Sequence, residues 1–275
     1  MIKSIVKTQF KHFSTLQQKQ PKKLRILSLH GYNNTKEIAE YQSKQFRKVF
    51  ENVADFSFID APYFITNDSP HKALLSLGFQ PPFRSWFQLR KVEAELQQNM
   101  INNKYNEVFG VEKSINLIVE EINQKGPFDG FMTFSQGSLM FRYFYRVAMD
   151  IAIHEQLVKI EEMPKFLISI GGVFFSDKKV NYKDQKFKQD DYIFPIDSIH
   201  INGIKDEFMD ILNESGQFQN PIVINHQGGH SFPKKMVDKD FQQMLQFMKK
   251  QYERKFQSLN NFNIDYDSLD FVVKE

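Results

Sequence analysis

The sequence predicts an α/β fold in which a mostly parallel sheet carries helices on both faces. Short, continuously apolar runs alternate along the chain with amphipathic stretches of helical spacing. Such runs are typical of strands that are buried on both faces, and the alternation is typical of βαβ units. The 275 residues are 41% hydrophobic, which is enough for one large core. The chain has no cysteine, so disulfides, thiolate metal sites and a cysteine nucleophile are excluded.

The apolar runs predict strands that each end at a polar residue or a glycine. They cover residues 24–29, 54–59, 128–134, 166–170, 199–202 and 222–225. Helical spacing of apolar residues predicts helices over 36–51, 108–122, 136 to about 152, and roughly 235–256. Because the carboxyl ends of parallel strands share one edge of the sheet, polar residues that follow the strands are expected to converge there.

Two connections are too long for plain turns. Residues 63–106, with a helical stretch near 89–100, and residues 173–196 are each either a lid or pocket wall, or surface decoration. We predict one α/β domain over 23–257, with 63–106 as its lid insertion. It is flanked by a basic extension over 1–22 and a loosely held tail over 258–275. Ordinary core packing is the alternative for each candidate pocket residue in these connections, namely Phe83, Trp86, Phe87, Phe174 and Phe175.

Charge and hydropathy exclude several classes of protein. The net charge is only +3, and no basic block is interleaved with aromatic residues, so no nucleic-acid partner is expected. No apolar run reaches the length of a membrane span, so we expect no integral membrane association. The first acidic residue is Glu37, and the basic segment before it is either a solvated lead-in or a mitochondrial presequence. Because that segment has no arginine before Arg25 and few hydroxyls, we expect a cytoplasmic protein, with a mitochondrial location as the alternative.

Ser135 is the candidate nucleophile. It ends the apolar run 128–134 and is followed by Gly137 and a helical pattern. A strand that turns sharply at Ser-x-Gly into a helix exposes the serine hydroxyl at the sheet edge, with the helix N-terminus beside the charge that develops during acyl transfer. An ordinary N-cap serine is the alternative. Thr133 stands where such turns usually have a first glycine, but the strict steric demand is expected at Gly137.

Asp206 and His230 are the candidates for the acid and the base that a serine nucleophile needs. His230 follows two glycines after the last predicted strand, and Asp206 lies three residues past Gly203 at the end of the strand before it. The chain order Ser, Asp, His is that of the α/β hydrolases. For Asp206 the alternative is an exposed surface acid, and His226, at the end of its strand, is predicted to be packed or exposed rather than catalytic.

Backbone N–H groups are expected to form the oxyanion hole. One should come from Gln136, directly after the nucleophile, and the other from Tyr32 in the loop after the first strand. His30 in that loop is predicted to shape it rather than to transfer protons. Asp60 is predicted to fix a turn at the rim of the pocket. The sequence shows neither a nucleotide-binding motif nor an evident metal-ligand set, so no cofactor and no metal are expected.

At these residues the chain resembles the FSH family of serine hydrolases. The matching segments are Leu-Ser-Leu-His-Gly-Tyr (27–32), Phe-Ile-Asp-Ala-Pro (58–62), Gly-Pro-Phe-Asp-Gly-Phe-Met-Thr-Phe-Ser-Gln-Gly (126–137), Gly-Ile-Lys-Asp-Glu (203–207) and Gly-Gly-His-Ser-Phe-Pro (228–233). The resemblance covers about residues 23–250, and Trp86 stands where the family commonly has an Arg-x-Trp-Trp-like segment. It implies an α/β-hydrolase fold, carboxylesterase activity without a cofactor, and a triad of Ser135, Asp206 and His230. Thr133 departs from the family pattern at the elbow, and Met209 departs from it after the acid.

The leading hypothesis is a serine esterase that acts through an acyl-enzyme on a small ester with an apolar acyl or alkyl part. A thioesterase or lysophospholipase-like acyl hydrolase would use the same chemistry. A catalytically inactive hydrolase fold that serves as a binding protein is the alternative from another class.

Overall fold

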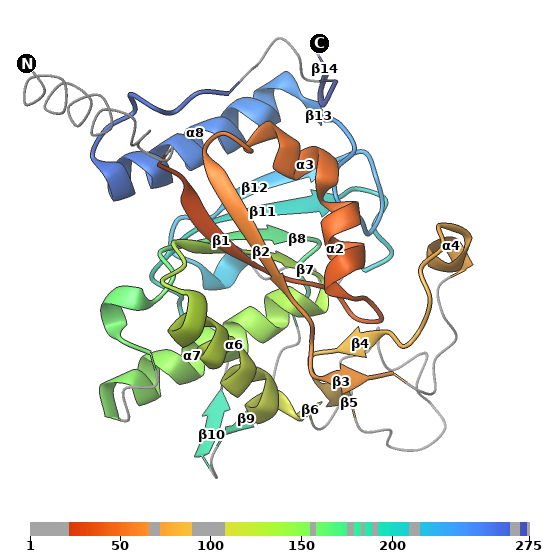
Figure 1. The fold of residues 1–275 in the computed structure, drawn as a ribbon, viewed down its shortest axis with the longest axis vertical. Coiled ribbons are helices and arrows are strands. Elements are labelled where there is room, and N and C mark those ends of the chain that lie inside the picture. The colour runs from red at the N-terminus through yellow and green to blue at the C-terminus, as the bar shows by residue number, and fades with distance from the viewer. Residues whose placement is uncertain are drawn as a thin grey trace, which may run out of the picture.

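The computed structural model describes most of the chain (Figure 1). The described residues are 22–65, 72–89, 108–154, 158–174, 179–182, 185–188, 192–208, 215–264 and 270–273. The extension predicted over 1–22, except for its last residue, lies outside these residues, as do Phe175, Met209 and most of the helical stretch expected near 89–100.

A six-stranded sheet of order β12-β11-β8-β7-β1-β2 forms the centre of the molecule, and every neighbouring pair in it is parallel. The strands are β1 (Leu24–Leu29), β2 (Ala54–Ile59), β7 (Gly130–Phe134), β8 (Phe166–Ile170), β11 (Asp197–Gly203) and β12 (Ile222–His226). Each predicted strand is present, to within two residues at its ends. Their continuously apolar sequences are explained by burial on both faces, since every residue of β7 and β8 is buried.

Helices cover the two faces in separate layers, as Figure 1 shows. On one face lie α2 (Lys36–Gln42), α3 (Lys44–Val49) and α8 (Asp238–Phe256); on the other lie α6 (Val111–Lys125) and α7 (Gln136–His154). Each face has its own apolar cluster, with Phe46 and Met248 in one and Ile118 and Phe144 in the other. This arrangement confirms the predicted fold class.

The structure differs from the sequence predictions in three places. The single helix expected over 36–51 is divided into α2 and α3 at Ser43, whose hydroxyl donates back to the Ala39 carbonyl and competes with the helical pattern. The helix expected from residue 108 begins at Val111 because β6 (Val108–Phe109) pairs with β5 (Gln88–Leu89). The tail is not loosely held over its described end: β14 (Val272–Val273) pairs with β13 (Met236–Val237), and Phe271 is buried.

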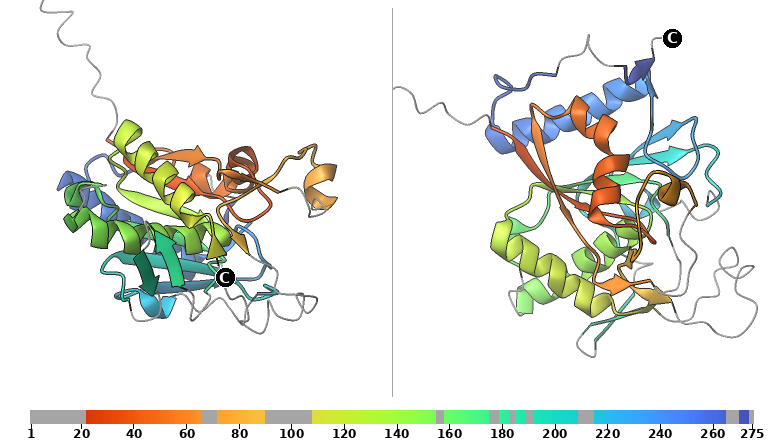
Figure 2. Two further views of the ribbon diagram at one scale, coloured as in Figure 1. Left: turned by 90° about the horizontal axis from the view of Figure 1, so that it is seen from below. Right: turned by 45° about the vertical axis from the view of Figure 1, so that its right-hand side comes forward.

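The long connections add small elements around the sheet. In the first, β3 (Tyr63–Phe64) pairs with β4 (Arg84–Ser85), and α4 (Lys72–Ser76) lies away from the sheet in Figure 1 and in the left view of Figure 2. In the second, β9 (Lys179–Tyr182) and β10 (Gln185–Lys188) form an antiparallel pair. Short 3-10 helices cover Ile160–Glu162 and Ser215–Gln217. None of the helices in the described ranges is long and apolar enough to cross a membrane.

Candidate active site

Ser135 lies at a strained turn between β7 and α7. Its φ is +51°, a left-handed conformation that non-glycine residues adopt rarely and that recurs at functional sites. Its backbone N–H donates to the Ile170 carbonyl at 3.1 Å, which holds the turn against the end of β8. A Cβ on Gly137 would lie 2.3 Å from the Leu29 carbonyl oxygen, so only glycine fits there. The side chain of Thr133, by contrast, fits within β7 and is fully buried.

His230 and Asp206 form a hydrogen-bonded pair. The His230 Nδ1 lies 2.7 Å from Asp206 Oδ2, and the Asp206 side chain is wholly buried while that of His230 is 16% exposed. The other carboxylate oxygen of Asp206 accepts from the Phe208 N–H at 2.9 Å. The rings of Phe134 and Phe208 lie 4.9 and 4.8 Å from the imidazole. The pair therefore has a fixed orientation and largely apolar surroundings.

Glycines bring the loops of the site into contact. Gly171 follows the Ile170 carbonyl that binds Ser135, has a φ of +52°, and would place a Cβ 3.1 Å from two atoms of the His230 ring. A Cβ on Gly203 would lie 2.2 Å from the Gly229 carbonyl oxygen, so the loops after β11 and β12 are in direct contact. Ser135, Asp206 and His230 thus gather at the carboxyl edge of the sheet, where the sequence expects them.

The loop after β1 runs beside the nucleophile. A Cβ on Gly31 would lie 3.3 Å from the Ser135 Cβ and 2.8 Å from the Phe134 ring, so the backbone of this loop approaches the elbow closely. Tyr32 comes next in this loop, and its side chain is 45% exposed. The backbone of this loop therefore lies close to Ser135.

His30 shapes this loop, as the sequence suggests. Its ring is buried, its Nε2 accepts from the Ala61 N–H at 3.0 Å, and its Nδ1 donates to the Gly31 carbonyl at 2.7 Å. Burial lowers the pKa of His30 to about 4, so the ring is neutral at physiological pH. Asp60 likewise takes a structural position: it accepts from the Lys36 N–H at the start of α2 and lies 3.7 Å from the Arg84 guanidinium.

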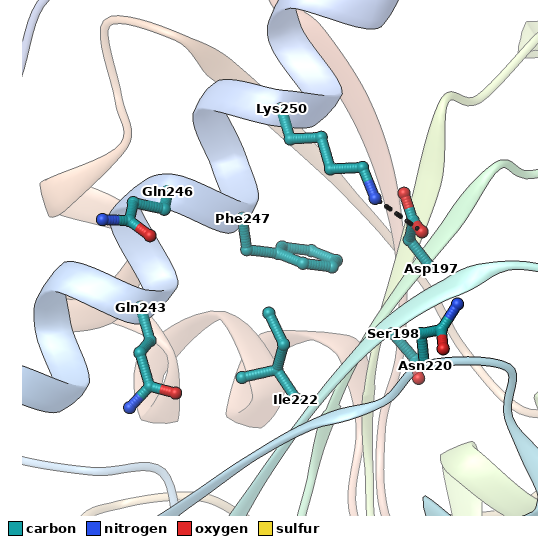
Figure 3. Close-up of a pocket in the computed structure, with 8 residues that line it drawn as sticks. All are labelled: Asp197, Ser198, Asn220, Ile222, Gln243, Gln246, Phe247 and Lys250. Carbon is teal, nitrogen blue, oxygen red and sulfur yellow. Dashed lines mark hydrogen bonds and ion pairs between the residues drawn. The ribbon is translucent and has the colours of Figure 1, made fainter.

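The described residues offer no group of three His, Asp or Glu side chains that could hold a metal ion. Two of the surface cavities among the described residues are formed by parts of the sheet and its helices. One of about 430 Å³ lies beside α2 and includes Phe83, Asp60 and Arg84 in its lining. The other, of about 420 Å³, lies between α8 and the start of β11 (Figure 3), at the edge of the sheet opposite to Ser135. Its Lys250 pairs with Asp197 at 3.0 Å.

Several known proteins are similar to this chain in sequence or in fold. Among solved structures, a carboxylesterase from Mesorhizobium loti has a TM-score of 0.47 and 11% identity, and the match covers 82% of this chain and 88% of that one. Acyl-protein thioesterase 2 from Zea mays has a TM-score of 0.47 and 12% identity, with 86% and 97% covered. Esterase CG5412 from Drosophila melanogaster is 31% identical over 215 residues, which are 77% of this chain and 69% of the relative.

A profile described as "Serine hydrolase (FSH1)" matches residues 18–242. The chain belongs to the FSH1 serine hydrolase family. The human esterase OVCA2 is a further relative, 22% identical over 220 residues, which are 76% of this chain and 89% of that protein. Family membership confirms the resemblance seen in the sequence and makes this protein a hydrolase with the α/β-hydrolase fold.

The aromatic residues predicted to line the pocket of this serine hydrolase fall into different surroundings. Trp86 and Phe87 are at most 1% exposed and belong to the core cluster around α6 and α7. These two side chains therefore fit the alternative of ordinary core packing. Phe83 is buried at the cavity beside α2. Phe174 is partly buried, and its ring lies under the Arg142 guanidinium at 4.6 Å.

Sequence reasoning missed two features of the FSH1 site. Gly171 was visible only as a strand-ending glycine, although its left-handed backbone and its approach to His230 make it part of the site. The side chain of Gln136 binds Trp86 across the fold, which no local pattern signals. The polar character of Gln136 directly after the nucleophile, on a buried helix, was the one available hint.

Proposed function

We propose that this serine hydrolase is a carboxylesterase that cleaves small esters with an apolar acyl or alkyl part. The observation that carries the proposal is the 2.7 Å contact between His230 Nδ1 and the buried Asp206 carboxylate, on loops that meet beside Ser135. With Nδ1–H donated to Asp206, the lone pair of the imidazole is on Nε2, the tautomer that a general base requires. The phenylalanine rings beside His230 favour an apolar substrate group.

The reaction would proceed in two halves. Ser135 Oγ attacks the ester carbonyl while His230 Nε2 takes its proton, and the carbonyl oxygen becomes an oxyanion held by the N–H groups of Gln136 and Tyr32. The tetrahedral intermediate then expels the alkoxide, which leaves as the alcohol with the proton from His230. In the second half, water gives a proton to His230 and attacks the acyl-enzyme, and Ser135 leaves with that proton as the acid is released.

Turnover of matched substrates tests this proposal. Oxygen esters and thioesters of equal acyl chain length are supplied to the wild type and to Ser135→Ala, with the fold of each checked by circular dichroism. We expect faster turnover of the oxygen esters, and a loss of about 10³-fold or more in Ser135→Ala. Faster turnover of the thioesters would make the protein an acyl thioesterase instead. Turnover of neither class by the wild type would favour a binding protein.

A further inference from the structure

Residues 84–89, which we call the strap, run from the start of β4 to the end of β5 and contact both the loop after β1 and the start of α7. At its centre the Trp86 indole N–H donates to the His30 carbonyl at 2.7 Å, and the indole lies 5.2 Å from the His30 ring. At its start Arg84 and Asn34 bond to each other in both directions, with N to O distances of 2.9 and 3.4 Å. The strap is therefore attached to the loop after β1 on both sides of Tyr32.

The same strap also binds the first residue of α7. The Trp86 backbone N–H donates to Gln136 Oε1 at 2.9 Å, and the Gln136 amide donates to Ser85 Oγ at 3.2 Å and to the Phe87 carbonyl at 3.3 Å. Trp86, Gln136 and Ser85 are all at most 7% exposed. Hydrogen bonds in such surroundings are stronger than in water because the local dielectric is low, so they hold the strap against Gln136.

We propose that the strap is the positioning element of the oxyanion hole, with Trp86 as its central positioning residue. This rests on the proposed function, in which the donors are the N–H groups of Tyr32 and Gln136. These donors belong to segments about a hundred residues apart in the chain. Trp86 bonds to both segments, through its indole to His30 and through its backbone to Gln136.

The N–H donors of an oxyanion hole must be held in place by the residues around them. An oxyanion hole stabilises the transition state only when its donors are fixed about 2.7–3.1 Å from the oxygen as it becomes charged. The His30 ring bonds to the Ala61 N–H and to the Gly31 carbonyl, while the backbone carbonyl of His30 accepts from the indole. Ser114 of α6 donates its hydroxyl to the Trp86 carbonyl, so the strap is itself held by the core. Loss of the indole bond should therefore loosen the Tyr32 donor without disturbing Asp206 or His230.

Trp86→Phe tests the proposal, because it keeps an aromatic ring and removes the indole N–H. Tyr252→Phe is the matched control: Tyr252 is buried, and its hydroxyl also donates to a backbone carbonyl, that of Lys22, at 2.8 Å and at the opposite edge of the sheet. We expect kcat of Trp86→Phe on a small ester to fall about 10- to 100-fold, while KM changes less than about threefold. The pH profile of kcat should keep its shape. Tyr252→Phe should leave kcat unchanged.

A trifluoromethyl ketone provides a second readout, because it forms an oxyanion on the serine. Its inhibition constant should rise in Trp86→Phe by the same factor by which kcat/KM falls, which a merely structural role for Trp86 would not produce. If Trp86→Phe does not fold, Ser114→Ala replaces it, with an expected fall in kcat of about three- to tenfold. The proposal is overturned if the folded variant keeps kcat within twofold of the wild type.

These outcomes are separate from a failure of the proposed function. A wild type without esterase turnover, or a Ser135→Ala variant with wild-type turnover, would contradict the proposed function and, with it, the proposed role of the strap. A normal Ser135 dependence with an unaffected Trp86→Phe variant would remove only the role of the strap.

Discussion

Thr133, the residue at which this elbow departs from the family pattern, gives a prediction about stability. It lies at the centre of the sheet without exposure, and its hydroxyl oxygen has no hydrogen-bond partner within the described part of the chain. A buried hydroxyl without a partner costs about 1–3 kcal/mol. Thr133→Val keeps the branched shape and removes the hydroxyl. We therefore expect its free energy of unfolding to rise by about 1–2 kcal/mol, which corresponds to about 2–4 °C in Tm for a domain of this size.

Thr133→Gly should have the opposite effect. It removes a packed side chain from a central strand and adds backbone freedom to the unfolded chain, for a loss of about 1–2 kcal/mol. Because the close contact of the elbow is at Gly137 rather than at Thr133, both variants should keep kcat within about threefold of the wild type.

Urea unfolding followed by circular dichroism measures the stabilities, and turnover of a small ester measures kcat. A less stable Thr133→Val would show that the hydroxyl is hydrogen-bonded in the folded protein. A tenfold faster Thr133→Gly would show that the threonine slows the nucleophile. Either result would refute the reasoning.

Three further predictions follow from the site. Asp206→Asn should lower kcat by about 10⁴-fold with the fold retained, because His230 loses the partner that fixes its tautomer; steady-state kinetics measure this, and a loss under tenfold would speak against the triad. Gly171→Ala places a methyl group 3.1 Å from the His230 ring at a φ of +52°, so kcat should fall at least about tenfold; Gly172→Ala, next in the chain, is the comparison. His30 has its pKa lowered to about 4 by burial, so only the unfolded chain takes up its proton as the pH falls from about 6.5 towards 4. The wild type should therefore lose about 2 kcal/mol more stability between pH 7 and pH 5 than His30→Gln in urea unfolding, and equal losses would contradict the burial of His30.

The sequence predicted the framework well because the framework depends on local pattern. Burial on both faces of a strand produces a continuous apolar run, which is visible in residues 166–170 as it is in 130–134. In a parallel sheet the residues after such runs share one edge, so the convergence of Asp206 and His230 follows from their place in the chain. The hydrogen bond between them agrees with that expectation.

What the sequence did not predict depends on contacts between distant segments. The bond between Gln136 and Trp86 joins residues 50 positions apart, and neither side chain has a local signature of it. Trp86 was a candidate for the pocket wall because long insertions at strand ends often form one, with core packing as the alternative, and the core around α6 and α7 encloses it. The described end of the tail is held by the burial of Phe271 and by pairing of β14 with β13, which is invisible without the fold.

Covalent labelling tests the central claim, that Ser135 is the nucleophile of an active esterase, most directly. The protein is treated with a fluorophosphonate at pH 7–8, digested, and the modified peptide is identified by mass spectrometry for the wild type, Ser135→Ala and His230→Ala. We expect one phosphonyl group on Ser135 in the wild type, none in Ser135→Ala, and strongly slowed labelling in His230→Ala. Equal labelling of Ser135→Ala, or no labelling of the folded wild type, would contradict the account.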